Sequence, residues 1–120
     1  MLIINEKDIT TEKFSAHGGM GLMEIKFAFK KHQHYGNDND SKWNCFAVAT
    51  LPIGATAGYH KHEDTDEIFY IIDGKATITI DGESHEIKKG DIILTRMGSS
   101  HGITKVKEKL KFTVTEIFRR

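Results

Sequence analysis

The chain has 120 residues, a length that suits one domain with its own hydrophobic core. Its 17 lysines and arginines balance its 17 aspartates and glutamates, so it lacks the basic surplus of a general nucleic-acid binder. Its apolar runs are too short for a membrane span or a signal peptide, and we therefore expect a cytoplasmic protein that binds neither nucleic acid nor membrane.

Residues 1–42 are expected to contribute N-terminal strands, a glycine-rich turn and a polar loop that pack on a barrel within the same domain. The glycine-rich stretch 17–21 suits either a phosphate-binding loop or a structural turn. Ile25, Phe27 and Phe29 alternate with other residues after it, and this period of two predicts a strand. Because a phosphate-binding loop needs a helix at that place, we favour the structural turn.

The polar stretch 31–42 predicts an exposed loop that contains a pair of histidines, His32 and His34. This pair could belong to a lid, form a second metal site, or consist of two solvated histidines. No carboxylate partner or strand scaffold is evident nearby in the sequence, so we favour solvated histidines.

An apolar strand is predicted from Trp43 to Leu51, ahead of Pro52. It contains the only cysteine, Cys45, which cannot form an internal disulfide. The apolar run after Cys45 favours a buried structural thiol over a reactive one.

Two histidines and a glutamate follow at a spacing that suits a metal site. Because alternate residues of a strand share a face, His60 and His62 should point the same way. A polar turn at 63–66 then lets Glu67 return towards them, and two imidazoles with a carboxylate are typical metal ligands. By the same alternation Phe69 and Ile71 should line a cavity beside Glu67. Phe69 is a candidate substrate contact, although packing in the core would explain it equally well.

The second half of the chain predicts short strands separated by turns. Asp73-Gly74 and Asp81-Gly82 are hairpin signals, and further turns are expected at 88–90 and 98–100. Strands are expected at 76–80, 84–87, 91–95, 103–106 and 110–118, the last with Leu110, Phe112 and Val114 on one face. No long helical period occurs, and this pattern predicts an all-β barrel or sandwich.

Two motifs make the chain resemble the cupin superfamily, over roughly residues 43–118. The first motif is met by Gly54, His60, His62, Glu67 and Gly74, and the second by Gly90, Gly98 and His101. Arg96 stands where the second motif usually has proline, and Lys105 where it usually has asparagine. The glycine-rich N-terminal stretch followed by both motifs is also similar to small single-domain bacterial cupins, some of which are grouped with manganese-dependent oxalate decarboxylases.

The resemblance implies a double-stranded β-helix, or jelly-roll barrel, with residues 43–118 forming the barrel. It adds His101 as a fourth ligand beside His60, His62 and Glu67, and implies one divalent metal ion per chain. Manganese, iron, nickel, cobalt, copper and zinc all suit mixed nitrogen and oxygen ligands, so the sequence leaves the metal open.

The implied function is that of a small metal-dependent enzyme acting on a small carboxylate or oxygenated acid, of decarboxylase or dioxygenase type. A non-catalytic module that binds a small ligand is an alternative, as is a sugar isomerase or epimerase, although no phosphate-binding cluster is evident. The sequence does not identify the substrate.

Three further expectations concern the surroundings of the site. Arg96 could hold a substrate carboxylate, but a solvated turn residue is favoured. Glu116 could act as a general acid or base if its strand lines the barrel, although a solvent-facing side chain is favoured. Open strand edges of a small barrel invite pairing with a second chain, so we expect a homodimer.

Overall fold

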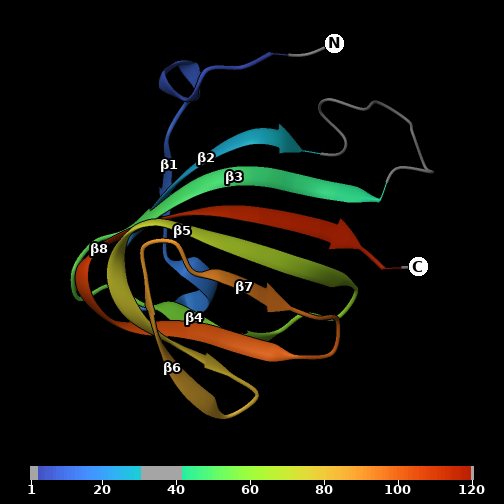
Figure 1. Ribbon diagram of the computed structural model, residues 1–120. Helices are drawn as coiled ribbons and strands as arrows, with labels where there is room; N and C mark the ends of the chain where they lie inside the picture. Colours follow the sequence, from blue (N-terminus) through green and yellow to red (C-terminus); the bar gives the residue numbers. More distant parts are fainter. Residues whose placement is uncertain (1–2, 31–41, 120) are drawn as a thin grey trace.

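The computed structural model describes residues 3–30 and 42–119, in which eight strands are all paired antiparallel (Figure 1). The strands are β1 (Glu12–Phe14), β2 (Met23–Lys30), β3 (Trp43–Leu51), β4 (Ala57–Lys61), β5 (Thr65–Ile80), β6 (Glu83–Lys88), β7 (Ile92–Thr95) and β8 (Ser100–Phe118). Two 3-10 helices, η1 (Glu6–Asp8) and η2 (Ala16–Gly18), lie before β2. His32 and His34 fall outside the described residues. Within the described ranges, no helix has the length and apolar character needed to cross a membrane.

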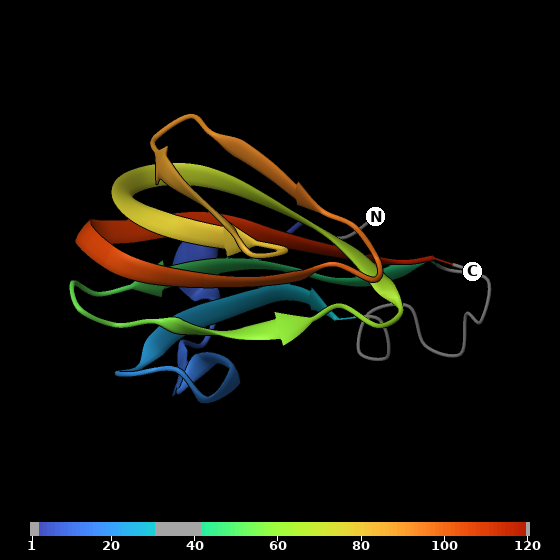
Figure 2. The same cartoon turned by 90° about the horizontal axis from the view of Figure 1, so that it is seen from below.

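The long strands β5 and β8 pair along their whole length, from Thr65 opposite Phe118 to Ile80 opposite His101. Both strands bend in the middle, so each contributes to two layers of the fold. In one layer they lie between β7 and β3, with β2 and β1 beyond; in the other they lie between β4 and β6. Figure 2 shows the two strands curving from one layer into the other. This arrangement confirms the predicted all-β jelly-roll barrel.

The two Asp-Gly pairs behave differently, and the hairpin predicted at Asp73-Gly74 is wrong. Strand β5 continues through Asp73 and Gly74, and its pairing with β8 becomes irregular between Ile71 and Thr77. Gly74 has a φ of 97°, and a Cβ atom there would lie 2.2 Å from the carbonyl oxygen of Lys109. The glycine therefore lets two backbones approach at a bend.

Two separate strands were expected at 103–106 and 110–118, but both segments belong to β8. This strand stays paired with β5 around the bend and therefore continues without a break. At the second Asp-Gly pair, by contrast, the predicted hairpin is confirmed. Ile80 pairs with Glu83, and both turn residues have positive φ, 47° for Asp81 and 84° for Gly82. Positive φ at both central residues is the requirement of a type I′ turn.

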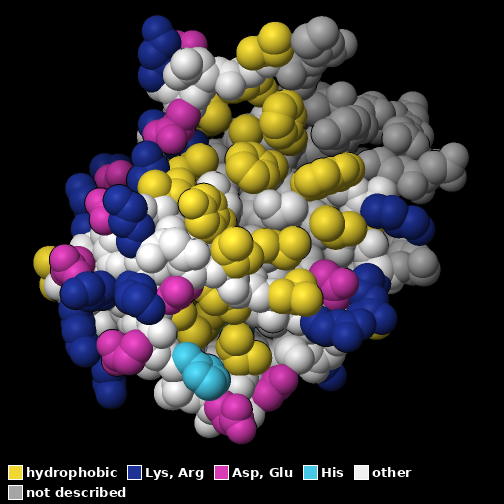
Figure 3. Space-filling view, viewed as in Figure 1, with side chains coloured by type: hydrophobic (Ala, Val, Ile, Leu, Met, Phe, Trp, Pro, Cys, Tyr) yellow, Lys and Arg dark blue, Asp and Glu magenta, His cyan; other side chains and the backbone are white. Residues whose placement is uncertain are grey.

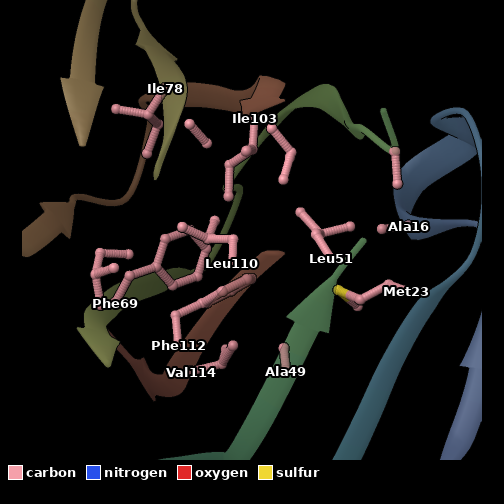
Figure 4. Packing of buried hydrophobic residues seen from close by; sticks show 14 of the residues in the cluster. Ala16, Met23, Ala49, Leu51, Phe69, Ile78, Ile103, Leu110, Phe112 and Val114 are labelled. Atoms are coloured by element: carbon pink, nitrogen blue, oxygen red, sulfur yellow. The ribbon is translucent and has the colours of Figure 1, made fainter. Parts of the chain in front are cut away.

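The core lies between the two layers and is built from alternate residues of the strands. On β3, Ala47, Ala49 and Leu51 are buried while the residues between them are partly exposed. The predicted apolar face of Leu110, Phe112 and Val114 is also confirmed as buried on β8. Figure 4 shows Phe69, Phe112 and Val114 on one side of this cluster, and Met23 and Ala16 on the other.

Replacing Gly74 by alanine should destabilise the fold more than the same change at Gly82. Both positions have positive φ, which costs an L-residue about 1–2 kcal/mol. Only at Gly74 would the added methyl group meet backbone atoms, because nothing lies within 4 Å of a Cβ atom at Gly82. Urea denaturation of the two variants measures the difference in unfolding free energy. Equal losses would show that the bend accommodates a side chain.

Candidate metal centre

The structure brings the four sequence-predicted ligands together from three strands. His60 lies near the end of β4 and His62 just after it, Glu67 is the third residue of β5, and His101 is the second residue of β8. Nε2 of His62 lies 3.2 Å from Nε2 of His60 and 3.0 Å from Nε2 of His101. Oε1 of Glu67 lies 3.2 Å from Nε2 of His62 and 3.0 Å from Nε2 of His101. Nε2 of His62 thus lies within 3.2 Å of a donor atom of each of the other three residues.

Each imidazole is oriented by a hydrogen bond at its other nitrogen. Nδ1 of His60 lies 2.7 Å from the carbonyl oxygen of Gly58, and because a carbonyl only accepts, Nδ1 carries the hydrogen. Nδ1 of His62 bonds to the hydroxyl of Thr65 at 3.0 Å, and Nδ1 of His101 to that of Thr95 at 2.7 Å. These contacts occupy each Nδ1 and direct each Nε2 towards the other candidate ligands. Sequence reasoning did not identify either threonine.

The spacing of the donor atoms fits a divalent metal ion. For metal–ligand bonds of about 2.1 Å, two ligands at right angles are about 3.0 Å apart, and two at the tetrahedral angle about 3.4 Å. The observed distances of 3.0–3.2 Å fall within this range. Three imidazoles and one carboxylate also match the ligand preferences of first-row transition metals.

The electrostatics of the four residues keep Glu67 ionised. Burial alone would raise the pKa of Glu67, but hydrogen bonds with His101, His62 and Glu116 outweigh it and hold the pKa well below its usual value. The hydrogen bond to Glu67 raises the pKa of His62, whereas burial lowers the pKa of His60. In the metal-free protein, His62 is therefore the first of these two histidines to take up a proton as the pH falls.

Glu116 lines the centre, and the expectation that it faces solvent is wrong. It is half-buried on β8, directly opposite Glu67 in the pairing of β5 with β8. The Asn44 side-chain amide donates to Oε2 of Glu116 at 2.6 Å, and the Cys45 thiol lies 3.8 Å from the same oxygen. Burial, the hydrogen bond with Glu67 and the charge of Glu67 raise the pKa of Glu116 to about 7. Burial also raises the pKa of the Cys45 thiol to about 12, in keeping with a structural role.

His17 also reaches the centre, although nothing in its spacing pointed there. Its ring stacks on the ring of His60, with centroids 3.5 Å apart and planes inclined by 14°. The backbone packs closely as well, because a Cβ atom on Gly58 would lie 2.0 Å from the carbonyl oxygen of His17. The Met20 amide donates to the hydroxyl of Thr56 at 2.7 Å. The glycine-rich stretch is thus a structural turn that places His17 over a candidate ligand.

A cavity of about 260 Å³ adjoins the four candidate ligands and is lined by His60, Glu67 and His101 among others. Phe69 lines it too, and its ring stacks on that of His101 with centroids 5.2 Å apart. Arg96 is exposed and does not line the cavity, which supports its interpretation as a solvated turn residue. A larger groove of about 660 Å³ lies elsewhere and contains none of these residues.

Comparison with known proteins identifies related chains. The sequence model of the cupin-domain family matches residues 47–118. The chain is 34% identical to a protein of Thermotoga maritima named oxalate-binding protein, over 85% of this chain and 81% of that protein. A crystal structure of a predicted oxalate decarboxylase from T. maritima is 32% identical, with a TM-score of 0.87 over 98% of this chain and 100% of the other. The polyketide cyclase RemF of Streptomyces resistomycificus shares the fold, with a TM-score of 0.77 at 18% identity over 100% and 81% of the two chains.

Metal affinity should fall as the pH falls below about 6, because the ligands bind only when deprotonated. The raised pKa of His62 means that binding near neutral pH displaces a proton from this residue, so the apparent affinity should keep rising above pH 6.5. Calorimetric titration of manganese into metal-free protein, in two buffers with different ionisation enthalpies, measures both the affinity and the protons released.

The matched control is His85→Gln, since His85 is exposed on β6 and pairs only weakly, at 3.9 Å, with Glu83. This variant should bind metal like the unmodified protein. Metal occupancy that is unchanged at pH 5 would contradict the assigned ligands.

Proposed function

This chain belongs to the cupin family, and from that premise we propose that it is a metal-dependent enzyme acting on a small carboxylate or other oxygenated acid. The reaction is of decarboxylase or dioxygenase type. The observation that carries the proposal is that donor atoms of His60, Glu67 and His101 lie 3.0–3.2 Å from Nε2 of His62, beside a cavity that Glu116 also lines. The names of the T. maritima relatives support an acid as the ligand.

His60, His62, Glu67 and His101 would hold one divalent ion per chain, with manganese and iron as the first candidates. When bound, the ion supplies a Lewis acid for the acid's oxygens and, where it is redox active, a centre for electron transfer. Gly58, Thr65 and Thr95 hold the imidazoles in the required orientation through their hydrogen bonds. Phe69 stacks on His101 and adds an apolar surface to this end of the cavity.

Glu116 is the residue that we assign to proton transfer. Loss of carbon dioxide from an acid leaves a carbanion that must be protonated, and dioxygen chemistry often begins with removal of a proton. Glu116 lies in the cavity next to Glu67, and Asn44 fixes one of its oxygens. With a pKa raised to about 7, its carboxyl group can either donate or accept a proton near neutral pH.

A non-catalytic small-ligand-binding module remains the second candidate, and one observation favours it: the curated T. maritima relative is named for binding oxalate. For the sugar isomerase or epimerase alternative, no supporting feature is present. Among the described residues that line the cavity there is no lysine or arginine to hold a phosphate group.

The proposal is tested by metal content and turnover, with His60→Ala and Glu116→Gln beside the unmodified protein. Elemental mass spectrometry should find about one divalent ion per chain, lost in His60→Ala and retained in Glu116→Gln. Release of carbon dioxide from oxalate and from 2-oxo acids, measured in air with manganese- or iron-loaded protein, should fall about 10²–10⁴-fold in Glu116→Gln.

Three outcomes would argue against this assignment. Tight binding of an acid without turnover would favour the binding module. A protein that takes up no metal, even after reconstitution, would overturn the metal centre. An active Glu116→Gln variant would remove Glu116 from proton transfer while leaving the centre in place.

We propose that the expected homodimer forms through a sheet face, and not through the open strand edges. On the outer side of β5 and β7, Tyr70 pairs with Ile92 and Ile68 with Leu94. Tyr70, Ile92 and Leu94 are exposed, with Ile92 at 71%. Figure 3 shows hydrophobic side chains across the middle of the face on which β5 and β7 lie, with most charged side chains towards its margins. A second copy of the same face would cover this apolar surface.

Ile92→Asp should convert the dimer into a monomer, because it places an unpaired charge in the buried face. Light scattering at micromolar concentration measures the mass, which should be that of two chains before the substitution and of one chain after it. Ile53→Asp is the control, since Ile53 is equally exposed, at 69%, but lies in the turn after β3. A mass of one chain for the unmodified protein would exclude the dimer.

A further inference from the structure

The cavity at the candidate metal centre combines a polar end with an apolar wall. Its polar side chains cluster at the four ligands: His17 stacks on His60, and Glu116 contacts Glu67. Most of the remaining lining is hydrophobic and includes Phe14 of β1, Met23, Ile25 and Phe27 of β2, and Phe112 and Val114 of β8. Figure 4 shows Met23 across the core from Phe112 and Val114. A ligand in this space would meet polar groups at one end and hydrocarbon along its body.

The charges in the cavity set a limit on the charge of the ligand. A divalent ion with the ionised Glu67 has one net positive charge, because the histidine ligands are neutral when they bind metal. If Glu116 is ionised, the net charge of the site becomes more negative. No lysine or arginine is among the described lining residues to offset it. A monoanion would neutralise the site, whereas a dianion would leave unpaired negative charge next to apolar side chains. Burying an unpaired charge is strongly unfavourable.

The size and polarity of the space set a second limit. An acid whose carboxylate and neighbouring oxygen bind the metal would occupy the polar end. The cavity volume of about 260 Å³ leaves room beyond this head group, where the wall is hydrocarbon. An apolar body would displace water from that wall and gain affinity, while oxalate has no apolar atoms with which to do so.

We propose that the site binds a monoanionic 2-oxo acid that carries an apolar, preferably aromatic, body, in preference to a dianion such as oxalate. This inference rests on the proposed function, because the head group needs the metal. It goes further in naming the class of ligand and in assigning its recognition to the apolar wall contributed largely by β1, β2 and β8.

The test compares three probes with manganese-loaded protein from which free metal has been removed: phenylpyruvate, pyruvate and oxalate. Pyruvate has the same head group as phenylpyruvate but no aromatic body. Isothermal titration calorimetry should show phenylpyruvate binding about 10–100-fold more tightly than pyruvate, the range expected for burying one aromatic group, and more tightly than oxalate. Equal affinities for phenylpyruvate and pyruvate, or tightest binding of oxalate, would overturn the inference.

A matched pair of variants locates the effect in the wall. Phe14→Ala removes an aromatic ring at the edge of the cavity, where the side chain is 40% exposed and its loss should spare the fold. The variant should bind phenylpyruvate several-fold more weakly and pyruvate unchanged. Ile53 is exposed and does not line the cavity, so Ile53→Ala should change the affinity for neither probe. If Phe14→Ala weakens both probes equally, the aromatic body does not contact the wall and the inference fails.

The outcomes separate this inference from the proposed function. Binding of phenylpyruvate without turnover would support the ligand class and argue against an enzyme. Metal-loaded protein that turns over oxalate but does not bind phenylpyruvate would support an enzyme and argue against the proposed ligand class. Protein that holds no metal would overturn both.

Discussion

The pairing of β5 with β8 is the interaction on which both the barrel and the metal centre depend. At one end it sets Glu67 opposite Glu116, and at the other it sets Ile80 opposite His101. Because β5 bends at Gly74 and β8 bends beside it near Lys109, the two ends turn towards the same interior, and Glu67 meets His101 at 3.0 Å. The shorter strands add to this pair. Strand β4 pairs with β8 so that His60 lies opposite His101, and β7 pairs with β5 so that Thr95 lies beside Glu67.

Placing two carboxylates in this interior creates an electrostatic problem that the structure resolves by giving them different protonation. Glu67 accepts hydrogen bonds from His62 and His101, which hold its pKa well below the usual value in spite of burial. Glu116 accepts a hydrogen bond from the Asn44 amide and lies 3.8 Å from the Cys45 thiol, while burial, the hydrogen bond with Glu67 and the charge of Glu67 raise its pKa. One carboxylate is thereby suited to bind a cation and the other to carry a proton, as in other sites that pair two acids.

Local sequence signals predicted those features that depend on neighbours in the chain, and failed where a distant strand decides. The alternation that puts His60 and His62 on one face needs only a strand, whereas the position of His101 was inferred from the family resemblance. Asp73-Gly74 and Asp81-Gly82 are the same dipeptide, yet only the second forms a hairpin. At the first, β8 follows β5 through the bend, and this non-local pairing overrides the turn preference.

The prediction for Glu116 failed for a different reason. The period of two through Leu110, Phe112 and Val114 continues to Glu116 and places it inside the barrel. Its charge, however, favoured a solvent-facing position. His17 gave no such signal. The family model matches residues 47–118, which hold all four candidate ligands and Glu116, while His17, Phe14 and the apolar side chains of β2 lie before that range. The candidate ligands therefore lie within the range that the family model describes, whereas the apolar lining of the cavity comes partly from that range, through Phe112 and Val114, and partly from the strands before it.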